Sequence, residues 1–404
     1  MEKMPLLFTP LQIAGATLRN RVVLSPMCQY CAIGGYADDW HLVHLGKFAL
    51  GGMGLVFTEA TAVEERGRIS YGDLGIWSDT FVPGLKRIAD FVRTQGALPG
   101  IQIAHAGRKG GWQRPWQGGG PLNAVDVARG EPAYALVGPT AEALAPGHTT
   151  PHALSPAEIA GVVEDFASAA ARADRAGFEA LEIHGAHGYL ISSFLSPGVN
   201  RRNDAYGGDR AGRMRLALEV TRAVRAGWPA SKPLFFRISS VDGAPGGWAI
   251  EDSIALAEEL GKAGVDVVDC SSGGMRGATA YENSSRKPGF QVGYASDIRK
   301  ATGMKTMAVG HILDARQAEA VLAEGHADLT AIGRQAMYDP YWPHHAAQAF
   351  SADPDFKRWN DQAGWWLAIR RRGLEKVGFG PDGRPLPMAE AVALVRELQG
   401  EGKC

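Results

Sequence analysis

The amino-acid sequence predicts an α/β protein built as a (β/α)8 TIM barrel, with a long loop after the third strand and an extended C-terminal tail. Eight short runs rich in β-branched residues alternate with longer segments of helical periodicity, a pattern typical of βα units around a parallel sheet. Eight is the strand number of a closed barrel. No run leads through a G-x-G-x-x-G turn into a helix, which favours the barrel over an open doubly wound sheet.

The eight expected strands are short, and helical or turn segments separate them. They are Arg21–Ser25, Leu55–Ala60, Gly100–Ala104, Ala180–His184, Leu234–Ile238, Val265–Cys270, Thr306–Gly310 and Asp328–Gly333. Helices are expected over Leu85–Gln95, Ser155–Ala176, Asp209–Ala226, Glu251–Ala263 and Asp314–Ala323. In the second of these helices Ser155 is a favourable N-cap, Pro156 suits the first helical position, and Gly177 ends the pattern.

Two long segments interrupt this alternation. Gly107–Thr150 follows the third strand, is rich in glycine and proline and contains two tryptophans. The segment from Ser351 onward contains three tryptophans, which argue against simple disorder. Loops of this length are usually lids or binding loops. We therefore expect a barrel domain over residues 1–350 and an extension over residues 351–404 that packs on the barrel or on a partner subunit.

Composition and charge exclude several classes of protein. Hydrophobic residues make up 45% of the chain and charged residues 21%, as in globular proteins with a large core. The net charge of −1 provides no field that would attract nucleic acid. The N-terminus lacks the pattern of a signal peptide, and no stretch approaches 18 uninterrupted apolar residues. We expect a soluble, cytoplasmic protein that binds neither nucleic acid nor membrane.

The four cysteines do not form a disulfide framework in a chain of this length. Cys28 and Cys31 form a C-x-x-C motif with two alternative interpretations: a dithiol redox pair, or half of a zinc site that His41 and His44 complete. A redox pair should open a helix, whereas Ile33-Gly34-Gly35 follows here. The gap before the histidines is unusual for zinc.

The residues just after each strand are the most informative, because barrel enzymes place their active sites at the C-terminal ends of the strands. Gly310 ends the seventh strand, and Gly333 and Arg334 end the eighth. Barrels often bind a phosphate group there, where glycine allows close approach and arginine binds phosphate through two hydrogen bonds. The alternative is an ordinary pair of turn glycines with a surface arginine.

Arg237 lies in an apolar strand and would point toward the other strand ends. A buried guanidinium keeps its charge and needs an anionic partner. The partner is either a neighbouring carboxylate, in a structural salt bridge, or a reduced flavin, which is anionic around its pyrimidine ring. Gln102, on a neighbouring strand, suits the imide edge of a flavin as well as a hydrogen bond within the core.

His184, His187 and Tyr189 lie within six positions at the end of the fourth strand. Two glycines between them allow a sharp turn, so that the three side chains need not alternate faces. Two imidazoles can bind a metal, which would suit a metal-dependent barrel hydrolase, but no clear third ligand follows. Two neutral imidazoles can instead donate to one carbonyl oxygen, with the phenol beside them as proton donor. We expect no metal.

Six longer motifs occur in order between Leu6 and Phe350. They are Leu7-Phe8-Thr9-Pro10, Asn20-Arg21-Val22, Ser25-Pro26-Met27-Cys28-Gln29-Tyr30, Asp39-Trp40-His41-Leu42-Val43-His44-Leu45-Gly46, His184-Gly185-Ala186-His187-Gly188-Tyr189-Leu190, and Asn200-Arg201-Arg202-Asn203-Asp204-Ala205-Tyr206-Gly207-Gly208. Through these motifs the chain resembles the Old Yellow Enzyme family of FMN oxidoreductases, in particular its thermophilic-like bacterial branch.

The resemblance implies a bound FMN. The implied cofactor-binding residues are Ser25, Pro26, Met27, Cys28, Ala60, Gln102, His184, Arg237, Gly310, Gly333 and Arg334. Cys28 would lie near the reactive flavin nitrogen, where a thiol can tune the redox potential, and Tyr30 would face the substrate. Arg237 would offset the charge of the reduced ring, and the last three residues would hold the phosphate.

The same resemblance implies a reaction in two steps. NADPH or NADH reduces FMN and leaves, and an enone or enal then stacks on the flavin. His184 and His187 hydrogen-bond its carbonyl oxygen, hydride passes to the β-carbon, and Tyr189 or solvent protonates the α-carbon. Cys28 and Tyr30 would also line the substrate site. The family further implies a homodimer or homotetramer, in which Trp366 or Arg371 is a candidate to reach the partner's site.

The sequence departs from the family pattern in three places. The loop around residues 282–287 is unusually polar, His311 follows Gly310 where an apolar residue is more usual, and the tail is longer. Other reactions of the same site stay open, namely reduction of nitro or nitrate-ester xenobiotics and desaturation of a saturated ketone. Relatives with an iron–sulfur cluster need several cysteines after the barrel, where Cys404 stands alone. A flavin-binding regulator without catalytic activity is a further alternative.

Overall fold

The barrel prediction is confirmed by a computed structural model, which describes residues 4–275, 287–380, 383–388 and 392–393. Its eight strands are β3 (Val22–Leu24), β4 (Leu55–Ala62), β6 (Leu98–Ala104), β9 (Ala180–Gly185), β10 (Leu234–Ser239), β11 (Val267–Ser271), β12 (Lys305–Ala308) and β13 (Leu329–Ile332). Each strand pairs in parallel with the next, and β13 pairs with β3 to close the barrel. All eight coincide with the runs expected from the sequence.

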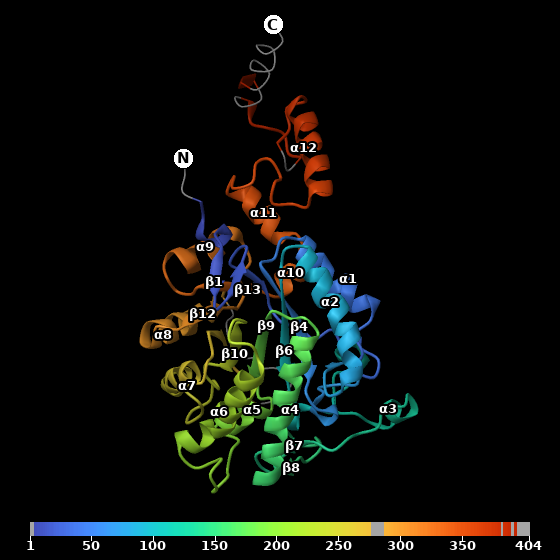
Figure 1. Cartoon of the computed structure of the whole chain (residues 1–404), viewed down its shortest axis with the longest axis vertical. Helices are drawn as coiled ribbons and strands as arrows, with labels where there is room; N and C mark the ends of the chain where they lie inside the picture. The colour runs from blue at the N-terminus through green and yellow to red at the C-terminus, as the bar shows by residue number, and fades with distance from the viewer. Residues whose placement is uncertain (1–3, 276–286, 381–382, 389–391, 394–404) are drawn as a thin grey trace.

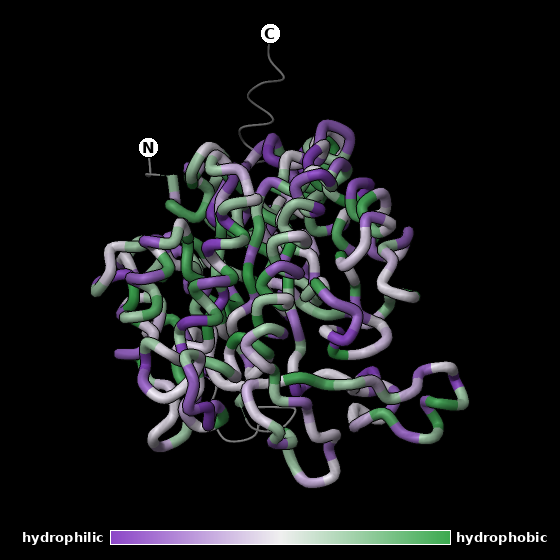
Figure 2. The backbone as a smooth tube through the Cα atoms, turned by 60° about the horizontal axis from the view of Figure 1, so that its bottom comes forward, coloured by the Kyte–Doolittle hydropathy of each residue, from purple (hydrophilic) through white to green (hydrophobic). Residues whose placement is uncertain are grey.

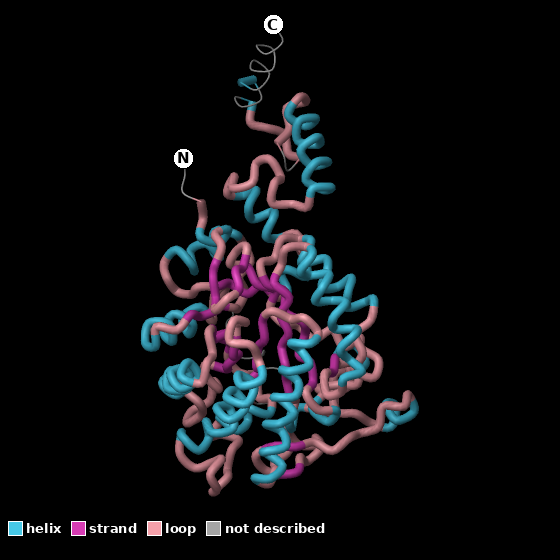
Figure 3. Tube along the Cα trace, viewed as in Figure 1, coloured by secondary structure: helices cyan, strands magenta, loops and turns pink. Residues whose placement is uncertain are grey.

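Helices surround the strands, as Figure 3 shows. They are α1 (Asp39–Leu50), α2 (Val82–Thr94), α4 (Pro156–Arg175), α6 (Arg210–Gly227), α7 (Ile250–Lys262), α8 (Val292–Thr302), α9 (Ala315–Ala323), α10 (Arg334–Tyr338) and α11 (Trp342–Ala349). The five expected helices correspond to α2, α4, α6, α7 and α9. The helices α1 and α8, which follow the first and sixth barrel strands, were not among those expected.

The start of α4 shows how local sequence sets an element. The Ser155 side chain accepts from the Glu158 amide, and the Glu158 carboxylate accepts from the Ser155 amide at 2.8 Å. This reciprocal arrangement is a capping box, and Pro156 occupies the first helical position. Gly177, with φ +82°, follows the helix. The cap and the stop expected from the sequence are therefore both present.

The barrel interior is layered along the strands. Because alternate residues of a strand face the same side, Phe235, Arg237 and Ser239 project inward at successive levels of β10. The lowest level is apolar, where Phe57 meets Phe235 edge to face at 5.4 Å between ring centroids. The hairpin of β1 (Leu11–Ile13) and β2 (Ala16–Leu18) contributes apolar side chains to the same cluster. Charged and polar side chains occupy the levels above.

The loop after β6 forms an arm that projects from the barrel (Figure 1). The arm contains the short helix α3 (Ala124–Ala128), and Val125 and Val127 are exposed on it. Along this arm hydrophobic and hydrophilic segments alternate, whereas hydrophobic segments dominate the barrel centre (Figure 2). The short parallel strands β7 (Val137–Gly138) and β8 (His152–Ala153) pair near the base of the arm.

The tail lies at the opposite end of the molecule from the arm (Figure 1). Trp359 stacks on His344 of α11, with ring centroids 4.4 Å apart. The helix α12 (Asp361–Glu375) follows, and Trp365 and Trp366 on it are 59% and 65% exposed. Among the described residues, no helix has the length and apolar character needed to cross a membrane.

Candidate active site

The three residues of the predicted catalytic cluster come together at the end of β9. The ring centroid of His184 lies 5.1 Å from that of His187 and 5.0 Å from that of Tyr189, both in edge-to-face geometry. His187 has φ +62°, and its amide donates to Ser239 Oγ at 2.8 Å. Tyr189 precedes α5 (Leu190–Leu195) as its N-cap residue. The turn thus directs all three side chains to one place, as expected.

Both imidazoles are held neutral. Burial lowers the pKa of His184 and of His187 well below the usual range, and the positive charges of Arg237 and Lys109 lower it further. The Ala186 amide donates to His184 Nδ1 at 3.2 Å, so the neutral ring carries its proton on Nε2. His187 Nε2 lies 2.7 Å from Ser271 Oγ. A neutral imidazole N–H suits a carbonyl oxygen as a hydrogen-bond donor.

The metal alternative finds no support in this geometry. Among the described residues, no three His, Cys, Asp or Glu side chains are grouped so that they could hold a metal ion. His184 Nδ1 and His187 Nε2 already have hydrogen-bond partners within the protein.

Beneath the imidazoles lies a buried layer of charged and polar groups. Arg237 Nε is 3.1 Å from Asp269 Oδ2, and Gln102 Nε2 donates to Glu182 Oε1 at 2.7 Å. Burial raises the pKa of Glu182 well above its usual range, and the neighbouring Asp269 charge adds to this effect. Glu182 and Asp269 thus share one buried layer with the guanidinium of Arg237. The salt bridge considered for Arg237 is present.

The end of β3 adjoins this layer from the other side. Ser25 Oγ accepts from Arg237 Nη1 at 3.3 Å. A Cβ on Gly333 would lie 3.6 Å from Met27 Sδ, so the ends of the first and eighth strands are neighbours. Of the predicted cofactor residues Ser25, Pro26, Met27 and Cys28, Ser25 thus contacts Arg237, and Ser25 and Met27 lie beside Gly333. Ala60 and Gln102 are partners in the register of β4 and β6.

The residues expected at a phosphate also lie together. Gly310 has φ +116°, a conformation that favours glycine. The next residue, His311, has its Nε2 3.3 Å from Arg334 Nη2. His311, the departure noted in the sequence, thus lies against the arginine expected to bind phosphate.

Cys28 and Cys31 are both free thiols. Burial raises the pKa of Cys28 well above its usual range, so the thiol stays protonated. His41 Nδ1 is 2.7 Å from Asp38 Oδ1, and the His44 ring stacks on Trp40 at 4.8 Å. In the described part of the chain, no three His, Cys, Asp or Glu side chains are grouped to hold a metal ion. The zinc interpretation of the C-x-x-C motif is not supported.

Tyr30 is held in a constrained position. Its φ is +54°, and its carbonyl oxygen accepts from Arg114 Nε at 3.1 Å. Its ring meets Trp116 edge to face, with centroids 6.1 Å apart. Burial raises the pKa of the Tyr30 phenol, which stays protonated. The arm after β6 therefore contributes to the surroundings of Tyr30.

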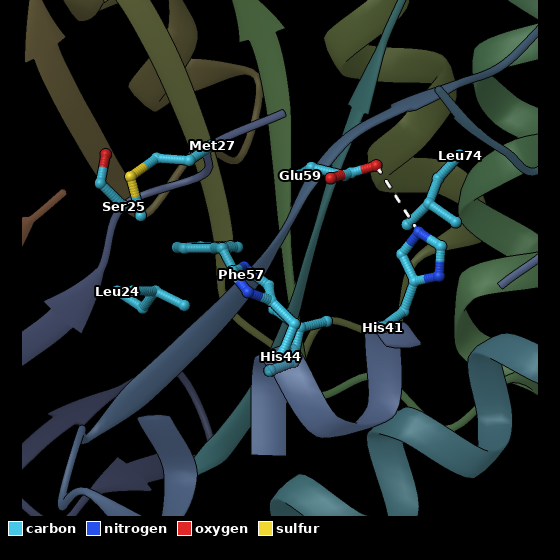
Figure 4. A pocket seen from close by; sticks show the side chains of 9 residues that line it. Leu24, Ser25, Met27, His41, His44, Phe57, Glu59 and Leu74 are labelled. Atoms are coloured by element: carbon cyan, nitrogen blue, oxygen red, sulfur yellow. Dashed lines mark ion pairs between the residues drawn. The ribbon is translucent and has the colours of Figure 1, made fainter. Parts of the chain in front are cut away.

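A pocket of about 270 Å³ lies against the end of β3 (Figure 4). It is lined by Leu24, Ser25, Met27, His41, His44, Leu45, Phe57, Glu59 and Leu74. Glu59 and His41 face each other across it, with Oε1 and Nε2 3.9 Å apart. Burial raises the pKa of Glu59 to about 8.

Several residues of the site escaped the sequence analysis. Lys109, Glu182 and Asp269 contact predicted residues, but they lie on the turn after β6, on β9 and on β11. Asp269 could have been found from the strand register, because it lies opposite Arg237 in the parallel pair of β10 and β11. Lys109 belongs to the turn just after the third strand, where an active-site residue is expected in a barrel.

Two predicted residues of the tail do not reach the site of their own chain. Trp366 and Arg371 lie on α12, away from the cluster of their own chain, and Arg371 Nε donates to Glu375 Oε1 at 2.6 Å. The polar loop of residues 282–286 and Cys404 lie outside the described residues.

The donor set fits FMN. The Gln102 amide and the Arg237 guanidinium would face the pyrimidine ring, and the Arg334 guanidinium beside Gly310 and Gly333 would hold the phosphate. Gln102 lies on β6, Arg237 on β10 and Arg334 just after β13 of the same barrel, so the residues that would hold the cofactor come from different strands.

The chain matches the model of the NADH:flavin oxidoreductase / NADH oxidase family over residues 6–353. It is 42% identical over 350 residues to an NADPH dehydrogenase of Geobacillus sp. (strain WCH70), covering 86% of this chain and 95% of that relative. No helix or strand of the barrel lies outside the matched range.

Solved structures are similar as well. Morphinone reductase has a TM-score of 0.71 at 27% identity, with 86% of this chain and 90% of that chain covered. A further structure of morphinone reductase, in complex with tetrahydroNAD, has a TM-score of 0.68 at 27% identity and covers 85% and 91%. A 2-naphthoyl-CoA reductase complex reaches a TM-score of 0.77 at 26% identity, but this chain covers 52% of its length. The chain therefore belongs to the NADH:flavin oxidoreductase / NADH oxidase family, the Old Yellow Enzyme family, and is an FMN-dependent oxidoreductase.

Proposed function

We propose that this enzyme uses NADPH to reduce the activated C=C bond of α,β-unsaturated carbonyl compounds. The observation that carries this proposal is the gathering of two neutral imidazoles and a phenol at the end of β9. An enone needs a hydrogen bond to its carbonyl oxygen, which gains negative charge in the transition state, and a proton at its α-carbon. The cluster offers donors for both.

His184 and His187 are the proposed donors to the carbonyl oxygen, and Tyr189 is the proposed proton donor. Because His184 Nδ1 accepts a backbone hydrogen bond, its Nε2–H is free to serve as donor. Tyr30 and Cys28 would line the substrate site. Bound FMN would supply hydride to the β-carbon.

We propose that FMN is held by residues from seven of the eight barrel strands or the turns that follow them. Ser25, Pro26, Met27 and Cys28 would line its ring, with Ala60, Gln102, His184 and Arg237 around it and Gly310, Gly333 and Arg334 at its phosphate. Asp269 neutralises part of the Arg237 charge when the flavin is oxidised. The remaining positive potential would favour the anionic reduced ring.

Nicotinamide would use the same site as the substrate. The Geobacillus relative is named an NADPH dehydrogenase, and a structure of morphinone reductase contains tetrahydroNAD. The predicted preference between NADPH and NADH is weak, because a shared site leaves few residues to discriminate the 2′-phosphate.

We further propose that residues 1–350 form the catalytic barrel and that the extension over residues 351–404 packs partly on a second copy of the chain. Trp359 packs on α11, whereas Trp365 and Trp366 expose apolar surface on α12. A homodimer or homotetramer would cover this surface and could bring Trp366 or Arg371 to a partner's site.

Steady-state rates on three substrates test the proposed reaction. With NADPH as reductant, cyclohexenone should be reduced faster than a nitroaromatic compound. With the oxidised enzyme and oxygen as electron acceptor in place of NADPH, a saturated ketone should not be desaturated at a comparable rate. If the enzyme does not reduce cyclohexenone but converts one of the other two compounds, the proposed ene-reduction is wrong and the reaction of that other compound takes its place.

A further inference from the structure

A buried lysine lies beside the proposed catalytic cluster and has no role in the function proposed above. Lys109 is 7% exposed and ends the short turn η4 (Gly107–Lys109) after β6. Its Nζ donates to the carbonyl oxygens of His187 at 2.7 Å and Gly274 at 2.8 Å. The same Nζ lies 5.1 Å from the centroid of the Tyr189 ring. One ammonium group thus connects the loops that follow β6, β9 and β11.

Two glycines allow the carbonyl groups to converge on Lys109. Gly188 has φ +76° and Gly274 has φ +91°. A Cβ on Gly188 would overlap the carbonyl oxygen of Gly274, and a Cβ on Gly274 would overlap the backbone of His187. The two loops are therefore in van der Waals contact, and Lys109 holds both. This contact fixes the backbone directly before Tyr189.

The charge of Lys109 acts on the same cluster. Within the described part of the chain, its ammonium is bound by carbonyl oxygens and no carboxylate pairs with it. The titratable and charged groups around it there are Arg108, His184, His187 and Tyr189. Burial, with a smaller effect of Arg108, lowers the pKa of Lys109 to about 8. A cation in a buried site stabilises a nearby negative charge more strongly than it would in water.

We propose that Lys109 is a positioning residue for proton transfer: its ammonium fixes Tyr189 and stabilises the tyrosinate that remains once the phenol has given up its proton. The inference rests on the proposed function, in which Tyr189 is the proton donor. In that reaction the C=C π bond breaks, the β-carbon gains hydride from reduced FMN, and the α-carbon gains the proton of Tyr189 Oη. The tyrosinate then takes a proton from water.

Three variants of the holoenzyme separate charge from backbone contact. Lys109→Arg keeps the charge, Lys109→Gln keeps a donor for the carbonyl groups without the charge, and Lys109→Met keeps neither. Flavin reduction by NADPH and flavin reoxidation by cyclohexenone are measured separately by anaerobic stopped flow between pH 6 and 10. Flavin absorbance and the melting temperature report whether each variant folds and retains FMN.

We expect the ratio of the reoxidation rate to the reduction rate to fall by about 10- to 100-fold in Lys109→Met and Lys109→Gln. This is at or below the lower end of the usual contribution of a positioned acid, because Lys109 acts on the acid and is not the acid itself. Lys109→Arg should retain most of the wild-type ratio. In the wild type, reoxidation should decline above about pH 8, where the ammonium loses its proton. This decline should be absent from the Gln and Met variants, which lack the titrating group.

A double-mutant cycle connects Lys109 to Tyr189. In a Tyr189→Phe background, Lys109→Gln should change reoxidation by less than about twofold, because the effect of Lys109 passes through the phenol. If the losses of Lys109→Gln and Tyr189→Phe simply add in the double variant, the inference is wrong. It is also wrong if all three Lys109 variants slow both half-reactions equally. If the wild type is not reoxidised by cyclohexenone, the proposed function fails. If the wild type is reoxidised and Lys109→Gln behaves like it, the inference on Lys109 fails alone.

Discussion

At the residue scale, the chemistry of the site depends on which groups stay neutral and which stay charged. Burial keeps His184 and His187 neutral at physiological pH, and Arg237 keeps its charge beside Asp269. The two uncharged imidazole donors suit the carbonyl oxygen of a substrate. The ion pair of Arg237 and Asp269 suits a flavin that changes between a neutral and an anionic form.

Tyr189→Phe tests the assigned proton donor. Reduction of the flavin by NADPH should be nearly unchanged, because this step needs no proton from the phenol. Reoxidation by an enone should slow by up to about 10²–10⁴-fold if no water replaces the phenol. Stopped-flow traces of the two half-reactions measure this. An equal loss in both would show that Tyr189 has another role.

His311→Met tests the phosphate end of the cofactor site. His311 Nε2 lies 3.3 Å from Arg334 Nη2, so the imidazole should orient the guanidinium. Removing it should weaken FMN binding by about tenfold, the value of one hydrogen bond to a charged group. Titration of the FMN-free protein with riboflavin, which lacks the phosphate, is the control. A loss of equal size for riboflavin would contradict the assignment.

The sequence indicated which side chains of the cluster at the end of β9 lie together, but not which groups surround them. His184, His187 and Tyr189 are close in sequence, so one turn brings them together. Lys109, by contrast, lies 78 residues before His187 and meets it only because the loops of a closed barrel converge. The salt bridge between Arg237 and Asp269 depends on strand register, which the sequence does not display.

At the element scale, the strands were predictable because buried parallel strands are continuous apolar runs. The helix α1 was not predicted, although Asp38 and His41 form a capping box at its start. The first turn of α1 contains His41, which was considered as a zinc ligand and as part of a family motif, and not as the start of a helix. The arm after β6 was expected as a long loop, but its contact with Tyr30 through Trp116 follows from the folded path of the loop.

Gly274→Ala tests the contact between the loops after β9 and β11. At φ +91° alanine is strained, and its Cβ would overlap the backbone of His187. The variant should lose more than about 1 kcal/mol of unfolding free energy and should also slow reoxidation by an enone. Gly293→Ala in α8, where a Cβ meets nothing within 4 Å, is the matched control and should be neutral or stabilising. Similar stability of the two variants would contradict the proposed contact.

At the scale of the whole molecule, the tail is joined to the barrel through a buried imidazole. His344 is 3% exposed, its Nε2 lies 3.1 Å from the Leu50 carbonyl oxygen, and Trp359 stacks on its ring. Burial lowers the pKa of His344 to about 4, from 6.5. Between these values the unfolded chain binds a proton that the native chain does not, so the stability contributed by this group falls as the pH falls.

His344→Gln keeps a donor for the Leu50 carbonyl oxygen and removes this titration. Between pH 6.5 and pH 4 the wild type should lose about 3 kcal/mol more unfolding free energy than the variant loses, at about 1.4 kcal/mol per pH unit. Urea unfolding at several pH values measures the difference. Parallel pH dependences would show that folding does not change the pKa of His344.

The central claim is that reduced FMN in this barrel passes hydride to an activated C=C bond. Anaerobic titration tests it most directly: NADPH should bleach the flavin absorbance near 450 nm, and one equivalent of cyclohexenone should restore it with formation of one equivalent of cyclohexanone. Bleaching that cyclohexenone does not reverse, while oxygen does, would contradict the claim.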